Sequence, residues 1–143
     1  MIPRFGPPPG HRPYRLRPGA YAILPRDGRL LLTFQESPVP EFQLPGGGID
    51  PGESALAALH REVAEETGWR IGGARRIGAY RRYCYMPEYG FWAEKLCQIW
   101  LARPVTRLGA PREKGHSAHW VSITAACRLV ADPGSRAFLS RLG

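Results

Sequence analysis

Two apolar runs near the start of the chain flank the dipeptide Asp27-Gly28. The first run covers residues 20–24 and the second covers residues 29–34. An Asp-Gly pair between two apolar runs favours a tight turn that joins antiparallel strands. The pattern therefore predicts a β-hairpin in this part of the chain.

A second hairpin is predicted further along, where aromatic residues and isoleucine are frequent. Its strands are residues 75–86 and 91–103, and the turn-forming residues 87–90 separate them. A polar segment, residues 104–117, is then predicted to be a loop, and residues 119–121 to be a short strand. The second half of the chain is therefore expected to contain mostly β-structure.

Residues 54–67 carry the strongest helical signal. They contain no internal glycine or proline and are rich in Ala, Leu and Glu, which are good helix formers. Ser54 suits the N-cap, and Gly68 suits the left-handed position that ends a helix. Shorter helices are predicted over residues 122–130 and 135–142. Helices combined with hairpins indicate an α+β or layered sandwich fold rather than a doubly wound parallel sheet.

The chain has 143 residues, which is enough for one domain with its own core. Residues 1–17 contain five prolines and four arginines, and they are predicted to form an arm, either a mobile tether or a strap across the surface. Residues 18–143 are predicted to form the folded domain. No apolar stretch is long enough for a membrane span or a secretory signal, so we expect a cytoplasmic protein without a membrane partner.

The charge balance indicates an anionic partner or simply a basic surface. The formal net charge is +8, and 18 of the 20 basic residues are arginine. Within this basic chain, residues 47–69 contain five acidic residues and a single arginine. The three cysteines form no C-x-x-C pair, which argues against a zinc ribbon or a disulfide framework.

The acidic segment places three carboxylates on one side of the predicted helix. Glu62, Glu65 and Glu66 fall within an arc of roughly 100° on a helix of 3.6 residues per turn. Like charges at these spacings destabilise a helix by about 0.2–0.5 kcal/mol per pair. A divalent cation would offset that cost, whereas the alternative is a solvated acidic face. The preceding residues 46–48 are all glycine and allow a ligand to approach the backbone closely.

The spacing of these residues resembles the Nudix box, a 23-residue pattern whose defined positions are all met. Its positions here read Gly47-x5-Glu53-x7-Arg61-Glu62-Val63-x-Glu65-Glu66-x-Gly68-Trp69. The resemblance implies an α/β/α sandwich with a mixed sheet and a catalytic loop–helix. It also implies a Mg²⁺- or Mn²⁺-dependent hydrolase that cleaves a nucleoside diphosphate linked to another group.

The resemblance further implies a role for each matching residue. The metal ligands would be three glutamates and one backbone carbonyl, namely those of Glu62, Glu65, Glu66 and Gly46. Glu53 and Arg61 would form an ion pair that orients the glutamates. The general base is either Glu62 or Glu113, and Glu94 is a weaker third candidate. If Glu113 is the base, the loop that carries it is expected to close over the substrate.

Substrate recognition is less constrained by the sequence. Tyr83 and Tyr85 share one face of a predicted strand and could stack on a nucleobase. His116 and His119 could contact phosphate or transfer protons, but they are interpreted as surface histidines. The candidate substrates are nucleoside triphosphates, dinucleoside polyphosphates and ADP-ribose. The competing hypothesis is a non-catalytic nucleotide sensor or RNA-binding module. Nucleic acid is a possible partner but not the favoured one, and the chain is expected to be a monomer or a homodimer.

Overall fold

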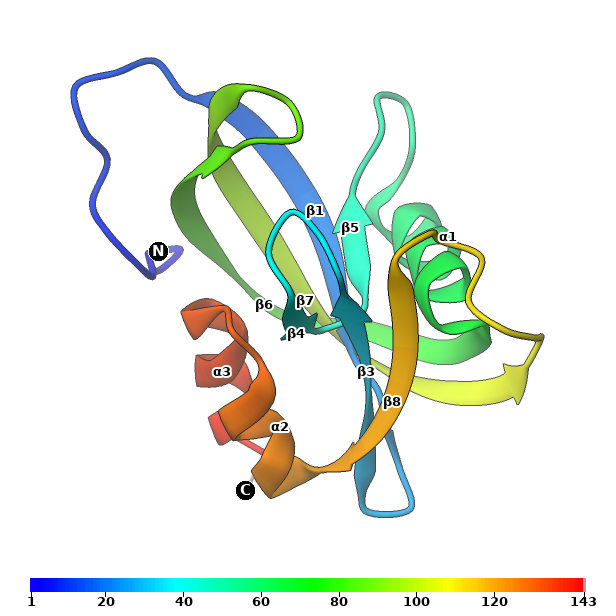
Figure 1. The fold of residues 1–143 in the computed structure, drawn as a ribbon. Helices are drawn as coiled ribbons and strands as arrows, with labels where there is room; N and C mark the ends of the chain where they lie inside the picture. Colours follow the sequence, from blue (N-terminus) through cyan, green and yellow to red (C-terminus); the bar gives the residue numbers. More distant parts are fainter. Residues whose placement is uncertain (143) are drawn as a thin grey trace.

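The computed structural model describes residues 1–142, which form two four-stranded sheets and three helices (Figure 1). The strands are β1 (Arg15–Ile23), β2 (Pro25–Arg26), β3 (Arg29–Gln35), β4 (Glu41–Gln43), β5 (Gly46–Gly48), β6 (Trp69–Met86), β7 (Phe91–Arg107) and β8 (His116–Ser122). The helices are α1 (Ala55–Thr67), α2 (Ile123–Leu129) and α3 (Pro133–Ser140). The predicted α+β class is confirmed.

The first sheet has the strand order β5-β1-β7-β6 and is mixed, because β1 runs parallel to β7 while the other pairs are antiparallel. In the second sheet β3 pairs with β2 and β4, and it also pairs with β8 along its whole length. Helix α1 lies on one side of the strands, and α2 and α3 lie on the other (Figure 1). This is the predicted α/β/α arrangement with a mixed sheet.

The first predicted hairpin is only partly right. Asp27 and Gly28 do form the turn, with φ values of 51° and 76°. However, only Pro25 and Arg26 pair across it, because β1 pairs instead with β5 and β7. Residues 20–24 are apolar on both faces of the strand, which suits the interior of a sheet that is covered on both sides.

Several other boundaries differ from the predictions. Strand β4 was not predicted, nor was the edge strand β5 that the three glycines form. Strand β7 extends to Arg107 and β8 begins at His116, so the predicted loop shrinks to residues 108–115. Helix α3 begins at Pro133, because the carboxylate of Asp132 accepts the N–H of Ser135 as an N-cap.

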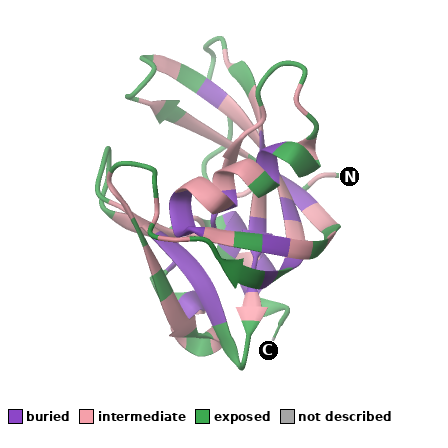
Figure 2. Ribbon diagram, turned by 90° about the vertical axis from the view of Figure 1, so that its right-hand side faces the viewer, coloured by how far each residue is buried: buried purple, intermediate pink, exposed green. Residues whose placement is uncertain are grey.

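The buried core divides into two clusters on the two faces of β1. Ala20 and Ala22 pack in the cluster that contains Leu59 and Val63 of α1. Ile23 packs in the other cluster, which includes residues from α2 and α3. Buried residues concentrate on the strands and on one face of the helix, and the connecting turns are exposed (Figure 2). No helix within residues 1–142 is long and apolar enough to cross a membrane.

The N-terminal segment takes the form of a strap rather than a tether. The N–H of Arg81 donates to the carbonyl of Pro3 at 2.8 Å, and the N–H of Phe5 donates to the carbonyl of Arg81 at 2.9 Å. The ring of Phe5 packs edge-on against Tyr80, with 5.7 Å between centroids. Strand β1 begins at Arg15, inside the segment assigned to the arm. The division of the chain at residue 17 therefore remains a prediction.

Candidate functional site

The ends of α1 are fixed by local contacts that match the predictions. The hydroxyl of Ser54 accepts the N–H of Ala57 at 3.0 Å, and Gly68 adopts a left-handed conformation with φ of 77°. A Cβ atom at Gly68 would lie 2.0 Å from the carbonyl oxygen of Gly109, so no larger residue fits there. These caps hold the last turns of α1, with its glutamates, against β5 and the loop before β8.

Glu66 is the most buried of the three helix glutamates, with 6% of its surface exposed. Its Oε1 accepts the N–H of Gly46 in β5 at 3.1 Å. Burial raises its pKa well above the ordinary value, and the nearby Glu62 and Glu113 raise the pKa further, against the opposing effect of the Gly46 hydrogen bond. Within residues 1–142, no basic side chain forms an ion pair with Glu66.

Glu62 lies directly against the backbone of the glycine strand. A Cβ atom at Gly47 would lie 2.6 Å from its carboxyl carbon, so this approach requires glycine. Burial raises the pKa of Glu62, while Arg61 acts in the opposite direction. The glycines of β5 thus allow two carboxylates to reach the backbone, which is the close approach that the sequence indicated.

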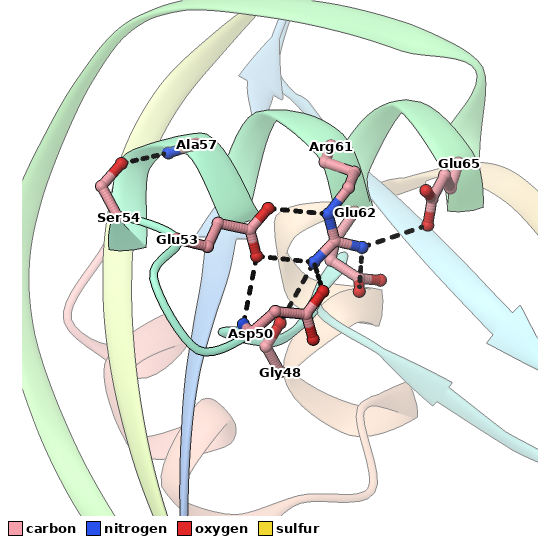
Figure 3. Close-up of polar contacts among 8 residues, drawn as sticks. All are labelled: Gly48, Asp50, Glu53, Ser54, Ala57, Arg61, Glu62 and Glu65. Atoms are coloured by element: carbon pink, nitrogen blue, oxygen red, sulfur yellow. Dashed lines mark hydrogen bonds and ion pairs between the residues drawn. The ribbon is translucent and has the colours of Figure 1, made fainter.

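Arg61 organises the acidic residues around it (Figure 3). Its Nε and Nη2 donate to the two carboxylate oxygens of Glu53, each at 2.8 Å, and its Nη1 donates to Glu62 at 2.8 Å. Nη1 also lies 3.5 Å from a carboxylate oxygen of Glu65. The hydrogen bonds from Arg61 lower the pKa of Glu53 to about 2. The expected Arg61–Glu53 ion pair is therefore present in the structure.

Glu113 already lies beside the helix glutamates. The N–H groups of Arg112 and Glu113 both donate to the carbonyl of Glu65 at 2.8 Å. A carbonyl in the last turn of a helix has no partner within the helix, so it is free to hold this loop. Glu113 lines the same cavity as Glu62 and Glu66. The loop is therefore already attached to α1 without substrate, and its closure over a substrate stays a prediction.

Glu94 lies away from this cluster. It faces Arg81 at 3.6 Å and accepts the hydroxyl of Tyr83 at 3.4 Å. Tyr83 itself packs against Tyr14, with 5.0 Å between ring centroids, and does not line the cavity. Tyr85 lies at the rim of the cavity and is 47% exposed. Only one of the two predicted substrate tyrosines therefore borders the candidate site.

The histidine interpretation also needs a correction. His116 lines the cavity, and its Nδ1 lies 2.8 Å from the hydroxyl of Thr33. Burial lowers its pKa. Its position on β8 opposite Gln35 explains why it faces inward. His119 remains outside the cavity, where its Nε2 lies 2.8 Å from the hydroxyl of Ser117.

The cavity has a volume of about 420 Å³ and is lined by groups of opposite charge. Glu62, Glu66 and Glu113 line it together with three basic residues of the first sheet, namely Arg17, Lys95 and Arg82. These three cations were not among the predicted site residues. The β6–β7 hairpin places Arg82 opposite Lys95, but the position of Arg17 depends on the register between β1 and β7, which are distant in sequence.

The carboxylates suit a hard divalent cation, which prefers oxygen ligands. Burial raises the pKa of Glu62 and of Glu66, and a bound cation would offset the cost of burying their charges. Within residues 1–142, however, no three acidic, histidine or cysteine side chains already surround a single metal position. Arg61 holds Glu62 and Glu65 in the present arrangement, so a cation has to compete with its guanidinium. These carboxylates can supply the oxygen ligands of a divalent metal, but the side chains have to move before they can coordinate one.

Replacing Arg61 with alanine is expected to reduce stability and catalytic rate together. The change removes the charge-assisted hydrogen bonds to Glu53 and Glu62 and should lower the free energy of unfolding by about 2 kcal/mol. Thermal unfolding and steady-state kinetics measure the two effects. Arg61→Lys keeps the charge without the two-pronged contact and should be intermediate. The exposed Arg75→Ala is the control, and unchanged stability and rate in Arg61→Ala would contradict the supporting role.

Comparison with known proteins gives a family and several relatives. The model of the NUDIX domain matches residues 13–142. A putative 8-oxo-dGTP diphosphatase from Bacillus subtilis is 40% identical over 70 residues, which are 49% of this chain and 47% of that protein. An RNA pyrophosphohydrolase from Legionella pneumophila is 37% identical over 70 residues, 49% of this chain and 39% of that protein. The chain thus spans less than half the length of these curated relatives.

Solved structures share the fold over most of the chain. A MutT NUDIX hydrolase from Burkholderia pseudomallei matches with a TM-score of 0.70 and 22% identity, covering 90% of this chain and 99% of that one. A NUDIX hydrolase from Nitrosomonas europaea matches with a TM-score of 0.68 and 23% identity, covering 90% of both chains. At these identities the likeness establishes the fold.

Proposed function

Because the chain belongs to the NUDIX family, we propose that it is a metal-dependent hydrolase of a pyrophosphate bond in a nucleoside diphosphate linked to another group. One observation carries the proposal: four glutamates meet at the end of α1, and within residues 1–142 no ion pair involves the buried Glu66. Such a cluster is unfavourable without a cation, and a cation there can face a diphosphate.

We propose that Glu62, Glu65 and Glu66, with the carbonyl of Gly46, hold Mg²⁺ or Mn²⁺. The metal would neutralise charge on the diphosphate and favour attack by water. Arg61 keeps the helix glutamates oriented through its hydrogen bonds to Glu53 and Glu62. The protein's own contribution is therefore a set of carboxylates gathered at one end of the cavity, which Arg61 holds until a cation replaces its contacts.

Glu113 is the better candidate for the general base. Its side chain lines the cavity, and no basic residue within residues 1–142 forms an ion pair with it. Glu62, in contrast, accepts a hydrogen bond from Arg61, which stabilises its charged form. A base has to lie within hydrogen-bond reach of the proton that it takes from water. The loop contacts to Glu65 hold Glu113 beside the last turn of α1, next to the proposed metal ligands, which supports this role.

The names of the relatives favour either a nucleotide such as 8-oxo-dGTP or an RNA as the substrate. Dinucleoside polyphosphates and ADP-ribose remain candidates from the resemblance. The competing function, a nucleotide sensor or RNA-binding module without catalysis, needs no general base and no complete set of glutamates. The chain has all three helix glutamates, and Glu113 lines the cavity with two of them, which supports the enzyme. A cytoplasmic location and a monomeric or homodimeric state remain predictions.

The proposal is tested with a panel of these substrates and Mg²⁺, with both products identified by mass. Hydrolysis is expected to depend on the divalent cation and to stop in excess EDTA, because the metal is proposed to neutralise charge on the diphosphate and to favour attack by water. Turnover that continues undiminished in EDTA would contradict the metal requirement. Tight nucleotide binding without any hydrolysis in Mg²⁺ would instead support the sensor.

A further inference from the structure

Three basic side chains form a row across the first sheet, on the face that lines the cavity. Arg17 of β1 pairs directly with Lys95 of β7, and Lys95 pairs directly with Arg82 of β6. Adjacent strands lie about 4.8 Å apart, so this cationic row spans roughly 10 Å. It occupies the wall of the cavity that is formed by the sheet, and the glutamates reach the same cavity from α1.

The cationic row carries more positive charge than its neighbours neutralise. Within residues 1–142, neither Arg17 nor Lys95 forms an ion pair with a carboxylate, and Lys95 is half-buried. The Nζ of Lys95 lies 5.7 Å from the ring centroid of Tyr21, and a phenol carries no charge at neutral pH. Only Arg82 has an acidic partner, Asp132 at 3.5 Å.

Like charges on directly opposed strand positions are destabilising, and a partly buried cation without an anion adds to the cost. A packing role for Lys95 would be served as well by an uncharged side chain of the same length, such as methionine. Three cations in register at one cavity wall therefore indicate that an anion occupies this place in the working protein.

The cationic row is continuous with the carboxylate end of the cavity. Tyr21, beside Lys95, pairs with Gly46, and the N–H of Gly46 donates to Glu66. A Cβ atom at Gly48 would lie 3.4 Å from an Nη atom of Arg17, so one end of the row lies at the glycine strand. An extended anionic chain could therefore contact both the carboxylate end and the cationic row.

We propose that Arg17, Lys95 and Arg82 bind a phosphoryl group that lies beyond the diphosphate being cleaved. The substrate is then a nucleotide with a chain of three or more phosphoryl groups. This rests on the proposed function and narrows its substrate class. A nucleoside triphosphate and a 5′-triphosphorylated RNA both supply the third phosphoryl group, whereas ADP-ribose places a neutral sugar there.

The first experiment measures binding alone, so it does not depend on catalysis. The full chain in EDTA is titrated with inorganic tripolyphosphate and with pyrophosphate by calorimetry. We expect tripolyphosphate to bind more tightly than pyrophosphate, and Lys95→Met to weaken tripolyphosphate binding at least tenfold. Arg75→Met, which removes an exposed charge outside the cavity, should bind as the wild type does. Arg17→Gln provides a second variant if Lys95→Met fails to fold.

The anion site would be overturned if the wild type does not bind tripolyphosphate, or if Lys95→Met and Arg17→Gln bind it as tightly as the wild type does.

The second experiment compares kcat/KM with Mg²⁺ for a nucleoside triphosphate, a 5′-triphosphorylated oligoribonucleotide and ADP-ribose. Lys95→Met should lower the ratio of triphosphate over ADP-ribose hydrolysis about tenfold, and an unchanged ratio would overturn the substrate assignment. The ratio between the two triphosphates shows whether the nucleotide or the RNA end is preferred. Lys95-dependent binding without hydrolysis of any substrate would refute the proposed function and leave the anion site standing.

Discussion

Glu113→Gln is expected to lower kcat by about 10²–10⁴-fold, the usual contribution of a general base. Glutamine keeps the shape of the side chain and the backbone contacts to Glu65, but it cannot take a proton from water. KM should change little, because the side chain is not proposed to hold the substrate. Steady-state kinetics at saturating Mg²⁺, with thermal unfolding to verify the fold, measure the effect.

The matched comparison is Glu62→Gln, which changes a proposed metal ligand in the same cavity. Its loss of activity should be partly reversed by raising the Mg²⁺ concentration, because a higher concentration restores the occupancy of a site that binds metal more weakly. Glu113→Gln should show no such rescue. If Glu113→Gln retains more than about a third of the wild-type kcat, well above the range for a lost base, then Glu62 or another group takes the proton.

Glu66→Gln should have opposite effects on activity and on the stability of the metal-free protein. A catalytic metal contributes several kcal/mol to the transition state, so losing a ligand should reduce kcat by about 10²-fold or more. In EDTA, however, the variant should unfold at a higher temperature than the wild type at neutral pH. Glutamine can still accept the N–H of Gly46, and it removes a buried charge that faces other carboxylates.

The gain in melting temperature expected for metal-free Glu66→Gln should depend on pH, because the pKa of Glu66 is raised. Because the folded protein holds this proton more tightly than the unfolded chain does, wild-type stability falls as pH rises from about 4.5 through the folded pKa. The melting temperatures of the variant and the wild type should therefore be similar near the lower end of this range and diverge at higher pH. Glu65→Gln, at a residue whose side chain is 31% exposed, is the control and should give a smaller gain. A gain that is absent at every pH would show that burial of the charge is not the dominant cost.

The parts of the site that the sequence predicted are those determined by neighbours along the chain. The caps Ser54 and Gly68, the helix between them and the Arg61–Glu53 pair all lie within 15 residues of one another. Their spacing on one helix and the loop before it is enough to bring the side chains together. The Nudix pattern can be recognised in the sequence for the same reason, because its positions all lie within 23 consecutive residues.

The parts that could not be predicted depend on pairing between distant segments. The Asp27-Gly28 turn is local and was predicted correctly, but β1 pairs with β7, which lies some seventy residues further along the chain. That register also brings Arg17 beside Lys95, whereas the sequence placed Arg17 in the arm. Glu113 was named as a candidate, yet its position depends on a hydrogen bond to Glu65 that no spacing rule predicts.

The strap formed by Pro3 and Phe5 has a consequence for how copies of the protein meet in solution. Strand β6 is the last strand of its sheet, and its outer edge carries backbone groups that could pair with any other extended chain. The strap uses both the N–H and the carbonyl of Arg81 at that edge. A shortened chain that lacks these residues would expose the backbone N–H and carbonyl of Arg81 at the edge of the sheet. At high concentration such chains would be prone to aggregate by pairing these strand edges between molecules.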